Sequence, residues 1–257
     1  MMRSVVLVLS ALMLSACAAL SAGPAGEPDY AAMAAENLAL GEAALEDNDY
    51  FKAEKYFDHV RTKFPYLEAA REAELKLADL DLAREMYPEA REKFDSFMRL
   101  HPTHPKVDYA AYRAAFSYVQ EFPSEFFALP PSYEKEQKPM YDALRAMNVF
   151  LREYPDSQYV KDATAHRDDA KQRLARHELY VASFYAKRER WKAVAQRLEG
   201  LLKNYPGTPL EEEALFDLHN AYVKLNDAER AQNTLKEVLK RLPGTPAAQR
   251  AQKMLGS

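Results

Sequence analysis

Residues 90–102 read AREKFDSFMRLHP, and the apolar side chains of this stretch stand at fixed distances from its final proline. Ala90, Phe94 and Phe97 precede Pro102 by twelve, eight and five positions, which are the spacings of one helix face. The proline cannot continue a helix, because it lacks an amide proton and its ring clashes with the preceding turn. The stretch is therefore predicted to be an amphipathic helix that ends just before Pro102.

The same spacing recurs before four other prolines along the chain. At twelve, eight and five positions before each of them stand a small or β-branched residue and two apolar ones: Ala53, Phe57 and Val60 before Pro65; Ala143, Met147 and Phe150 before Pro155; Val194, Leu198 and Leu201 before Pro206; Ala231, Leu235 and Val238 before Pro243. This pattern resembles the tetratricopeptide repeat (TPR), a helical hairpin whose second helix carries a small residue, a Phe-like residue and a terminating proline.

The first helix of each predicted hairpin is less regular but has a recognisable pair of positions. These pairs are Leu40-Gly41, Leu77-Ala78, Ala114-Ala115, Val181-Ala182 and Leu218-His219. Gly41 stands where the TPR consensus has a glycine that lets two helices approach closely. His219 departs from the small-residue rule and leaves the packing of the fifth hairpin open.

The distances between the prolines are unequal and indicate two irregular regions. Successive distances are 37, 53, 51 and 37 residues, against a consensus of about 34. The 53 predicts an irregular, proline-rich and aromatic insertion at 121–138, which contains Phe126 and Phe127, and the 51 predicts an additional or extended helix at 158–176. The expected fold is all-α: a TPR solenoid of five hairpins over residues 30–257, with a short capping helix at 247–255.

The N-terminus has the features of a secretory signal with an attachment site for lipid. Arg3 precedes a short apolar run, and Leu14-Ser15-Ala16-Cys17 resembles the lipobox of bacterial lipoproteins. The resemblance implies a signal peptide at 1–16 and a lipidated, flexible tether at 17–29, with Cys17 carrying acyl chains that anchor the protein durably. Ala18 implies sorting to the outer membrane. A plain secretory signal, cut within Ala-Cys-Ala, is the alternative.

Composition and motifs argue against catalysis and nucleic-acid binding. The formal charge is −4, whereas a nucleic-acid coat requires a basic surface. No phosphate-binding, zinc-protease or nucleophile-elbow motif occurs, and His101 and His104 lie in a helix-ending turn without a third ligand. We therefore expect no enzyme, no metal and no cofactor. The rival hypothesis of an enzyme on a TPR frame requires a pocket of convergent titratable groups.

Two features suggest surfaces that bind polypeptides. Residues 165–198 contain nine Arg or Lys and four acidic residues, so they form either a docking face for an acidic domain or a solvated helix face. Trp191 lies in this stretch, as an inter-helix packing residue or an interface anchor. Tyr109, Tyr112 and Phe116 share one helix face, so they belong either to the core or to a groove for an extended peptide.

Three stretches resemble the BamD family, the TPR lipoproteins of the outer-membrane β-barrel assembly machinery (the BAM complex). They are RLHPTHPKVDYAAY (99–112), YPDSQYVKDAT (154–164) and RLARHELYVASFYAKRERWKAVAQRLEGLLKNYP (173–206). The TPR consensus does not demand most of the third stretch, so it is the most specific of them. The insertion at 121–138 falls where the family carries one, although its sequence departs from the family's.

The resemblance implies a scaffold at the periplasmic face of the outer membrane. Its C-terminal repeats are expected to bind the POTRA region of the barrel subunit BamA, with Arg197 the best-matched position, Arg188 the next and Trp191 beside them. Its N-terminal repeats are expected to receive unfolded outer-membrane proteins, and accessory BAM lipoproteins are possible partners. Another TPR lipoprotein adaptor that organises envelope complexes is the alternative.

Overall fold

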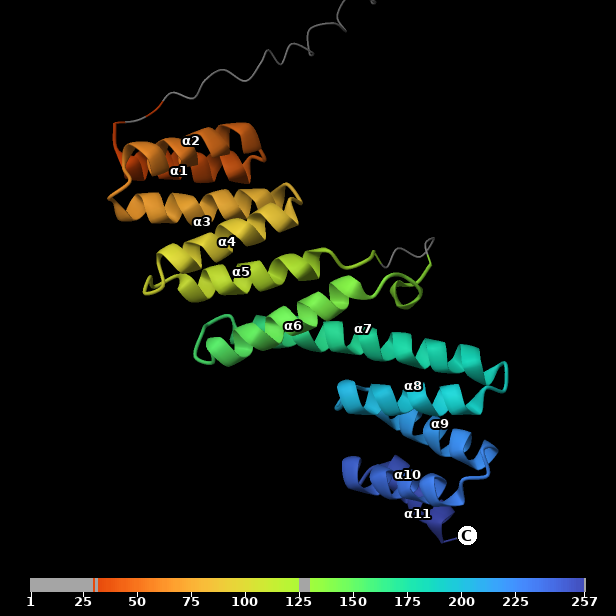
Figure 1. The fold of residues 1–257 in the computed structure, drawn as a ribbon. Coiled ribbons are helices and arrows are strands. Elements are labelled where there is room, and N and C mark those ends of the chain that lie inside the picture. Colours follow the sequence, from red (N-terminus) through yellow and green to blue (C-terminus); the bar gives the residue numbers. More distant parts are fainter. Residues whose placement is uncertain (1–29, 31, 125–129, 257) are drawn as a thin grey trace, which may run out of the picture. The chain divides into compact units, whose positions relative to one another are not determined.

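The structure is a computed structural model that describes residue 30 and residues 32–124 and 130–256. Every regular element among these residues is helical (Figure 1). The chain divides into two compact units, residues 1–80 and 81–257. The predicted signal peptide and tether, Cys17 included, and Phe126 and Phe127 of the insertion lie outside the described residues.

The helices of the described chain follow one another in the order expected for five hairpins and a short final helix. Their bounds are α1 Ala34–Glu46, α2 Tyr50–Lys63, α3 Glu68–Ala83, α4 Tyr87–Leu100, α5 Val107–Gln120, α6 Lys138–Glu153, α7 Val160–Ala186, α8 Trp191–Asn204, α9 Glu211–Lys224, α10 Ala228–Arg241 and α11 Pro246–Leu255. Consecutive helices from α4 to α11 pack on one another within the second unit (Figure 1). The predicted fold class, an all-α TPR solenoid with a C-terminal helix, is confirmed.

The proline-based spacing identifies the core. All fifteen side chains at twelve, eight and five positions before the five prolines are at most 4% exposed. Each proline stands two residues after the last residue of α2, α4, α6, α8 or α10. The apolar face and the helix end are therefore set together by the same short stretch of sequence.

Four of the five hairpins share one turn. Asn48, Glu85, Glu189 and Asn226 each stand between the two helices of a hairpin with a φ of 54 to 61°, in the left-handed region. The third hairpin instead contains the predicted insertion, in which the described residues form one 3-10 turn, Ser132–Glu134. The second irregular region is resolved in favour of an extended helix, because α7 runs for 27 residues without a break.

Gly41 and His219 occupy equivalent positions in the first helix of their hairpins, but they contact the second helix in different ways. A Cβ added to Gly41 would lie 2.5 Å from Cε1 of the fully buried Phe57, so α1 and α2 approach as closely as they do only without a side chain there. His219 is half-buried, and its Nδ1 donates a hydrogen bond of 2.9 Å to the carbonyl oxygen of Ala231 on α10. The fifth hairpin thus accommodates the larger side chain through a polar contact with its second helix.

Within the described residues, none of the helices combines the length and the apolar character that a membrane span requires. The long α7 carries many charged residues along its length.

Candidate partner-binding surfaces

Arg197 on α8 forms an ion pair with Glu178 on α7. The Nη1 of Arg197 lies 3.3 Å from Oε2 of Glu178, and the two side chains are 44% and 13% exposed. The guanidinium is therefore reachable from solvent while its carboxylate partner is mostly covered. The pair joins the two helices of the fourth hairpin at the surface of the second unit.

Arg188, in the turn after α7, is held against Phe184. Its guanidinium carbon lies 3.5 Å from the centre of the Phe184 ring, and its Nη1 donates a 3.0 Å hydrogen bond to the Phe184 carbonyl. Both residues are exposed. The stack keeps a cation and an aromatic ring together on the surface, an arrangement that suits contact with a partly apolar, acidic partner.

Trp191 begins α8 and is half-buried against the C-terminal core. Its neighbours include Leu225 in a shallow pocket and Lys224, whose Nζ lies 5.9 Å from the ring centre. Six positions separate Trp191 from Arg197, which places them roughly 120° apart around α8. The structure thus does not bring these two predicted residues onto one face, and Trp191 has a packing role in this chain.

Part of the basic stretch is neutralised locally and part is exposed. Arg167, Arg173 and Arg197 pair with Asp168, Asp169 and Glu178 respectively. The exposed cations of the stretch are Arg176, Lys187, Arg188, Arg190, Lys192 and Arg197. Arg176 lies on α7, Lys187, Arg188 and Arg190 lie in the turn, and Lys192 and Arg197 lie on α8, so most of the exposed positive charge is in the turn and the first half of α8.

Two exposed aromatic residues in this region were not singled out from the sequence. Tyr180 and Phe184 are 37% and 42% exposed, one helical turn apart on α7, and Tyr180 contacts the ring of Tyr133 at 5.2 Å. With Arg176 and Arg188 they form a strip at four-residue spacing. The four-residue spacing of these side chains was the available signal in the sequence. We call Arg176, Tyr180, Phe184, Arg188 and Arg197 the α7–α8 surface.

The three predicted groove residues of α5, Tyr109, Tyr112 and Phe116, are engaged in packing inside the second unit. Tyr112 is 8% exposed and stacks on Tyr159 at 4.9 Å with an interplanar angle of 6°. Tyr109 also contacts Tyr159, and the ring of Phe116 lies 5.1 Å from that of His166 on α7. Burial raises the pKa of the Tyr112 hydroxyl above its ordinary value. A groove role for these residues stays a prediction, while their packing role is observed.

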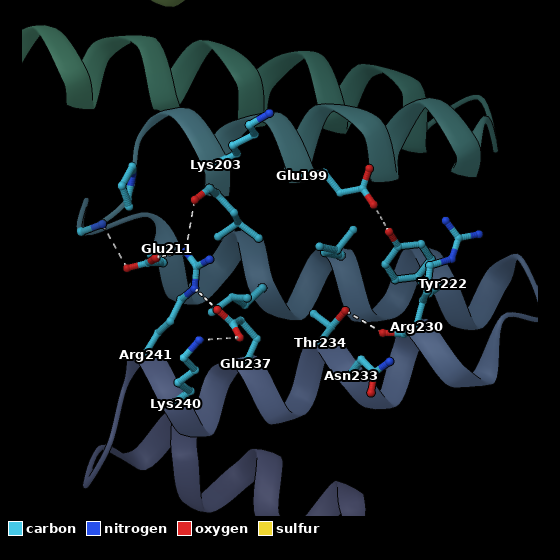
Figure 2. A pocket seen from close by; sticks show the side chains of 15 residues that line it. Glu199, Lys203, Glu211, Tyr222, Arg230, Asn233, Thr234, Glu237, Lys240 and Arg241 are labelled. Atoms are coloured by element: carbon cyan, nitrogen blue, oxygen red, sulfur yellow. Dashed lines mark hydrogen bonds and ion pairs between the residues drawn. The ribbon is translucent and has the colours of Figure 1, made fainter.

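Two grooves run between second helices of neighbouring hairpins in the second unit. One, of about 390 Å³, lies over α5 between α4 and α6, and the other, of about 950 Å³, lies over α9 between α8 and α10 (Figure 2). Across residues 30–256 as described, no three His, Cys, Asp or Glu side chains come together in a manner suited to a metal ion. The ion pairs of the described chain include pairs within single helices, as between Arg61 and Asp58, and pairs that join two helices, as between Arg197 and Glu178.

Comparison with known proteins identifies the family. A family described as YfiO, outer membrane lipoprotein, matches residues 31–239. Proteins named outer membrane protein assembly factor BamD are similar to this chain. The one from Pasteurella multocida is 32% identical over 190 residues, 73% of each chain. The one from Haemophilus influenzae is 32% identical over 233 residues, 89% of this chain and 88% of its own. The one from Neisseria gonorrhoeae is 29% identical over 250 residues, 95% of this chain and 93% of its own.

The family match over residues 31–239 spans the first four hairpins and nearly all of the fifth. The resemblance seen in the three sequence stretches is confirmed: this chain belongs to the YfiO family of outer-membrane lipoproteins, the family of BamD.

Proposed function

We propose that this chain is a lipid-anchored scaffold of outer-membrane β-barrel assembly, which binds a BamA-type barrel subunit and its unfolded substrates without catalysing a reaction. The family match over residues 31–239 is the observation that supports this most strongly, because it spans nearly the whole helical array. The alignments with the BamD proteins of Haemophilus influenzae and Neisseria gonorrhoeae cover most of this chain and most of each of those proteins. The alternative, another lipoprotein adaptor of the envelope, shares the helical repeats but not this match.

The barrel subunit's periplasmic POTRA region is proposed to bind the α7–α8 surface. Arg197 presents an exposed guanidinium, and its pair with Glu178 is worth only about 1 kcal/mol, because solvent screens the pair at the arginine although the carboxylate is mostly covered. Arg197 can therefore exchange Glu178 for a carboxylate of the partner at small cost. Tyr180 and Phe184 offer apolar area next to it, and an interface needs both area and charge complementarity.

The lipid anchor is proposed to be the acylated Cys17. The protein would then lie at the periplasmic face of the outer membrane, tethered through residues 17–29. Two or more acyl chains are needed for stable anchoring, which the lipoprotein modification supplies. The intact mass of the mature protein extracted from membranes tests this, since Cys17→Ser must remove the acyl mass and release the protein from the membrane fraction.

Unfolded outer-membrane proteins are proposed to contact the N-terminal repeats and the α5 region. Tyr109 and Phe116 are only half-buried, so their ring edges are the groups of the aromatic cluster within reach of a bound strand. Tyr112 would act by holding them in place, because its own ring is covered. Accessory lipoproteins of the same machinery are further proposed partners.

Co-purification from cell envelopes tests the proposed function. Tagged wild-type chain should retain a BamA-type barrel subunit, and Arg197→Glu should reduce the retained amount by roughly tenfold, because it replaces an attraction by a repulsion. Arg61→Glu is the matched control: Arg61 is also an exposed arginine in an ion pair, with Asp58 at 2.9 Å, but it lies on α2. Absence of a barrel subunit from the wild-type sample would favour the alternative adaptor.

A further inference from the structure

The groove over α9, between α8 and α10, is lined by both acidic and basic residues (Figure 2). These residues differ in whether another side chain of the groove already binds them. Its lining includes three carboxylates and four cations above an apolar floor. The floor consists mainly of Leu202, Leu215, Leu218 and Tyr222, all of which are buried.

Each of the three carboxylates already has a partner within the groove. Glu199 accepts a hydrogen bond from the hydroxyl of Tyr222, as Figure 2 shows. Glu211 accepts from Nη1 of Arg241 at 2.6 Å and from the amide of Gly207 at 3.2 Å. Glu237 accepts from Nε of Arg241 at 2.7 Å. Glu211 and Glu237 are thus paired with a cation, whereas Glu199, which is exposed, is hydrogen-bonded only to a neutral hydroxyl.

The cations of the groove differ in whether they form close ion pairs or hydrogen bonds. Arg241 is fully engaged, because it also donates to the carbonyl of Leu202 at 3.1 Å. Lys240, on the α10 rim, is 78% exposed and reaches Glu237 only at 3.9 Å. Lys203, on the opposite α8 rim, is exposed and makes no ion pair or hydrogen bond within the described part of the chain. Each rim therefore has an exposed lysine, Lys203 on α8 and Lys240 on α10, and the lining as a whole contains one more cation than carboxylates.

The shape of the groove suits an extended chain. Glu211 and Tyr222, which line its two ends, are eleven positions apart on α9, roughly 16 Å at about 1.5 Å per residue. That length holds about five residues of extended polypeptide at ~3.3 Å each. Side chains that point alternately to the floor and to the rims would meet leucines below and lysines above.

The equivalent groove over α5 lacks this excess of cations. Its Arg91 binds Ser117 and Glu121, at 3.1 and 2.8 Å, and its guanidinium carbon lies 4.1 Å from the ring centre of Tyr118. Its Arg145 pairs with Asp142 at 3.1 Å. Both of its cations are thus engaged, and its volume is less than half as large. Both grooves lie over the first helix of a hairpin, between two second helices, but they differ in the charge of their lining residues.

We propose that the α8–α10 groove is a second docking site, which binds an extended segment of a partner protein in which acidic side chains alternate with apolar ones. It is separate from the α7–α8 surface, because the lining of the groove includes none of the residues of that surface. The two sites would let one chain hold two polypeptides at once.

Fluorescence anisotropy of the mature, full-length protein with synthetic peptides tests the proposal. The probes are three labelled peptides of equal length in which leucine alternates with aspartate, asparagine or lysine. The aspartate peptide should bind at least about tenfold more tightly than the lysine peptide, and added salt should weaken it, since exposed charges are screened. Equal affinity for the aspartate and lysine peptides would overturn the proposal.

Variants locate the binding. The double variant Lys203→Glu/Lys240→Glu should weaken the aspartate peptide at least about tenfold. Asn233→Trp, which fills the groove from its α10 wall without changing charge, should weaken all three peptides. Lys253→Glu, an exposed lysine of α11 outside the groove, is the matched control and should leave binding within about twofold. An equal loss in Lys253→Glu and the double variant would contradict the assignment.

Arg197→Glu should leave peptide binding intact. A failure of peptide binding can therefore be distinguished from a failure of the co-purification experiment with the barrel subunit.

Discussion

Glu178 on α7 lies 3.3 Å from Arg197 on α8, and the carboxylate is far more covered than the guanidinium that it faces. If Arg197 binds a partner by exchanging this carboxylate, Glu178 competes with the partner. Glu178→Gln removes the competing charge and should raise the amount of barrel subunit that co-purifies with the chain, by roughly twofold to fivefold for a pair worth about 0.5–1 kcal/mol.

The stability of the Glu178→Gln variant serves as its control. Loss of this ion pair, whose arginine is exposed to solvent, should change the free energy of unfolding by about 1 kcal/mol, as read from urea denaturation. A fall in co-purified barrel subunit with unchanged stability would show that Glu178 itself contacts the partner, which is contrary to the exchange.

Two glycines are predicted to respond to alanine with opposite signs. Gly41→Ala places a methyl group 2.5 Å from the Phe57 ring, which is fully buried and cannot move aside, so the variant should be destabilised by about 1–3 kcal/mol. Gly200 in α8 has no atom within 4 Å of the added Cβ, so Gly200→Ala should stabilise by about 0.5–1 kcal/mol.

The measurement for these glycine variants has to report on the unit in which each glycine lies, the first for Gly41 and the second for Gly200. The chain's single tryptophan, Trp191, lies in the second unit, whereas Gly41 and Phe57 lie in the first. Far-UV circular dichroism in urea reports on helices of both units and is the appropriate measurement. A neutral or stabilising Gly41→Ala would contradict the close approach of α1 and α2.

Tyr112 is predicted to stabilise the third and fourth hairpins through its ring rather than its hydroxyl. Tyr112→Ala leaves a cavity beside Tyr159 and Phe150 and should cost about 3–5 kcal/mol, whereas Tyr112→Phe keeps the stack and should cost less than about 1 kcal/mol. Tyr66, which is almost fully exposed, provides the control Tyr66→Ala, with an expected effect within about 0.5 kcal/mol. Equal effects of the two alanine variants would disprove the packing role of Tyr112.

The fifth hairpin should lose stability in acid through Glu237. The hydrogen bond from Arg241 holds the pKa of Glu237 below its ordinary value of 4.5. A carboxyl whose pKa is lowered by folding stabilises the fold fully above about pH 4.5, and this contribution is lost as the pH falls through the lower, folded-state pKa. The urea midpoint followed by Trp191 fluorescence should therefore fall less between pH 7 and about pH 3 in Glu237→Gln than in the wild type.

Glu212→Gln is the control for this titration, because Glu212 is an exposed residue of the first turn of α9. Its pH dependence should match that of the wild type. If Glu237→Gln also matched the wild type, the contact between Arg241 and Glu237 would contribute nothing to the acid sensitivity.

The hairpins were predictable from the sequence because their determinants are local. The positions of Ala90, Phe94 and Phe97 before Pro102 state both which face is buried and where the helix ends, within one stretch of thirteen residues. The same holds for the other four prolines. The long distance between Pro155 and Pro206 indicated either an additional or an extended helix at 158–176, and the structure has the extended one, α7.

Contacts between helices were not predictable in the same way. The pairing of Arg197 with Glu178 and the hydrogen bond of His219 to Ala231 join residues of different helices, and the stack of Tyr112 on Tyr159 joins α5 to the turn before α7. They depend on how one helix is rotated against the next, and helical periodicity leaves that rotation open within the width of an apolar face. Trp191 and Arg197 are a different case, because both lie on α8 and their six-residue spacing alone places them on different faces of that helix.

Site-specific photocrosslinking in intact cells tests the central claim, that the α7–α8 surface binds a BamA-type barrel subunit, most directly. A photoreactive phenylalanine analogue placed at position 184 or 188 should crosslink to the barrel subunit. The same analogue at the exposed positions 61 on α2 and 253 on α11 should not. Crosslinks to the barrel subunit from 61 and 253 but not from 184 and 188 would contradict the account.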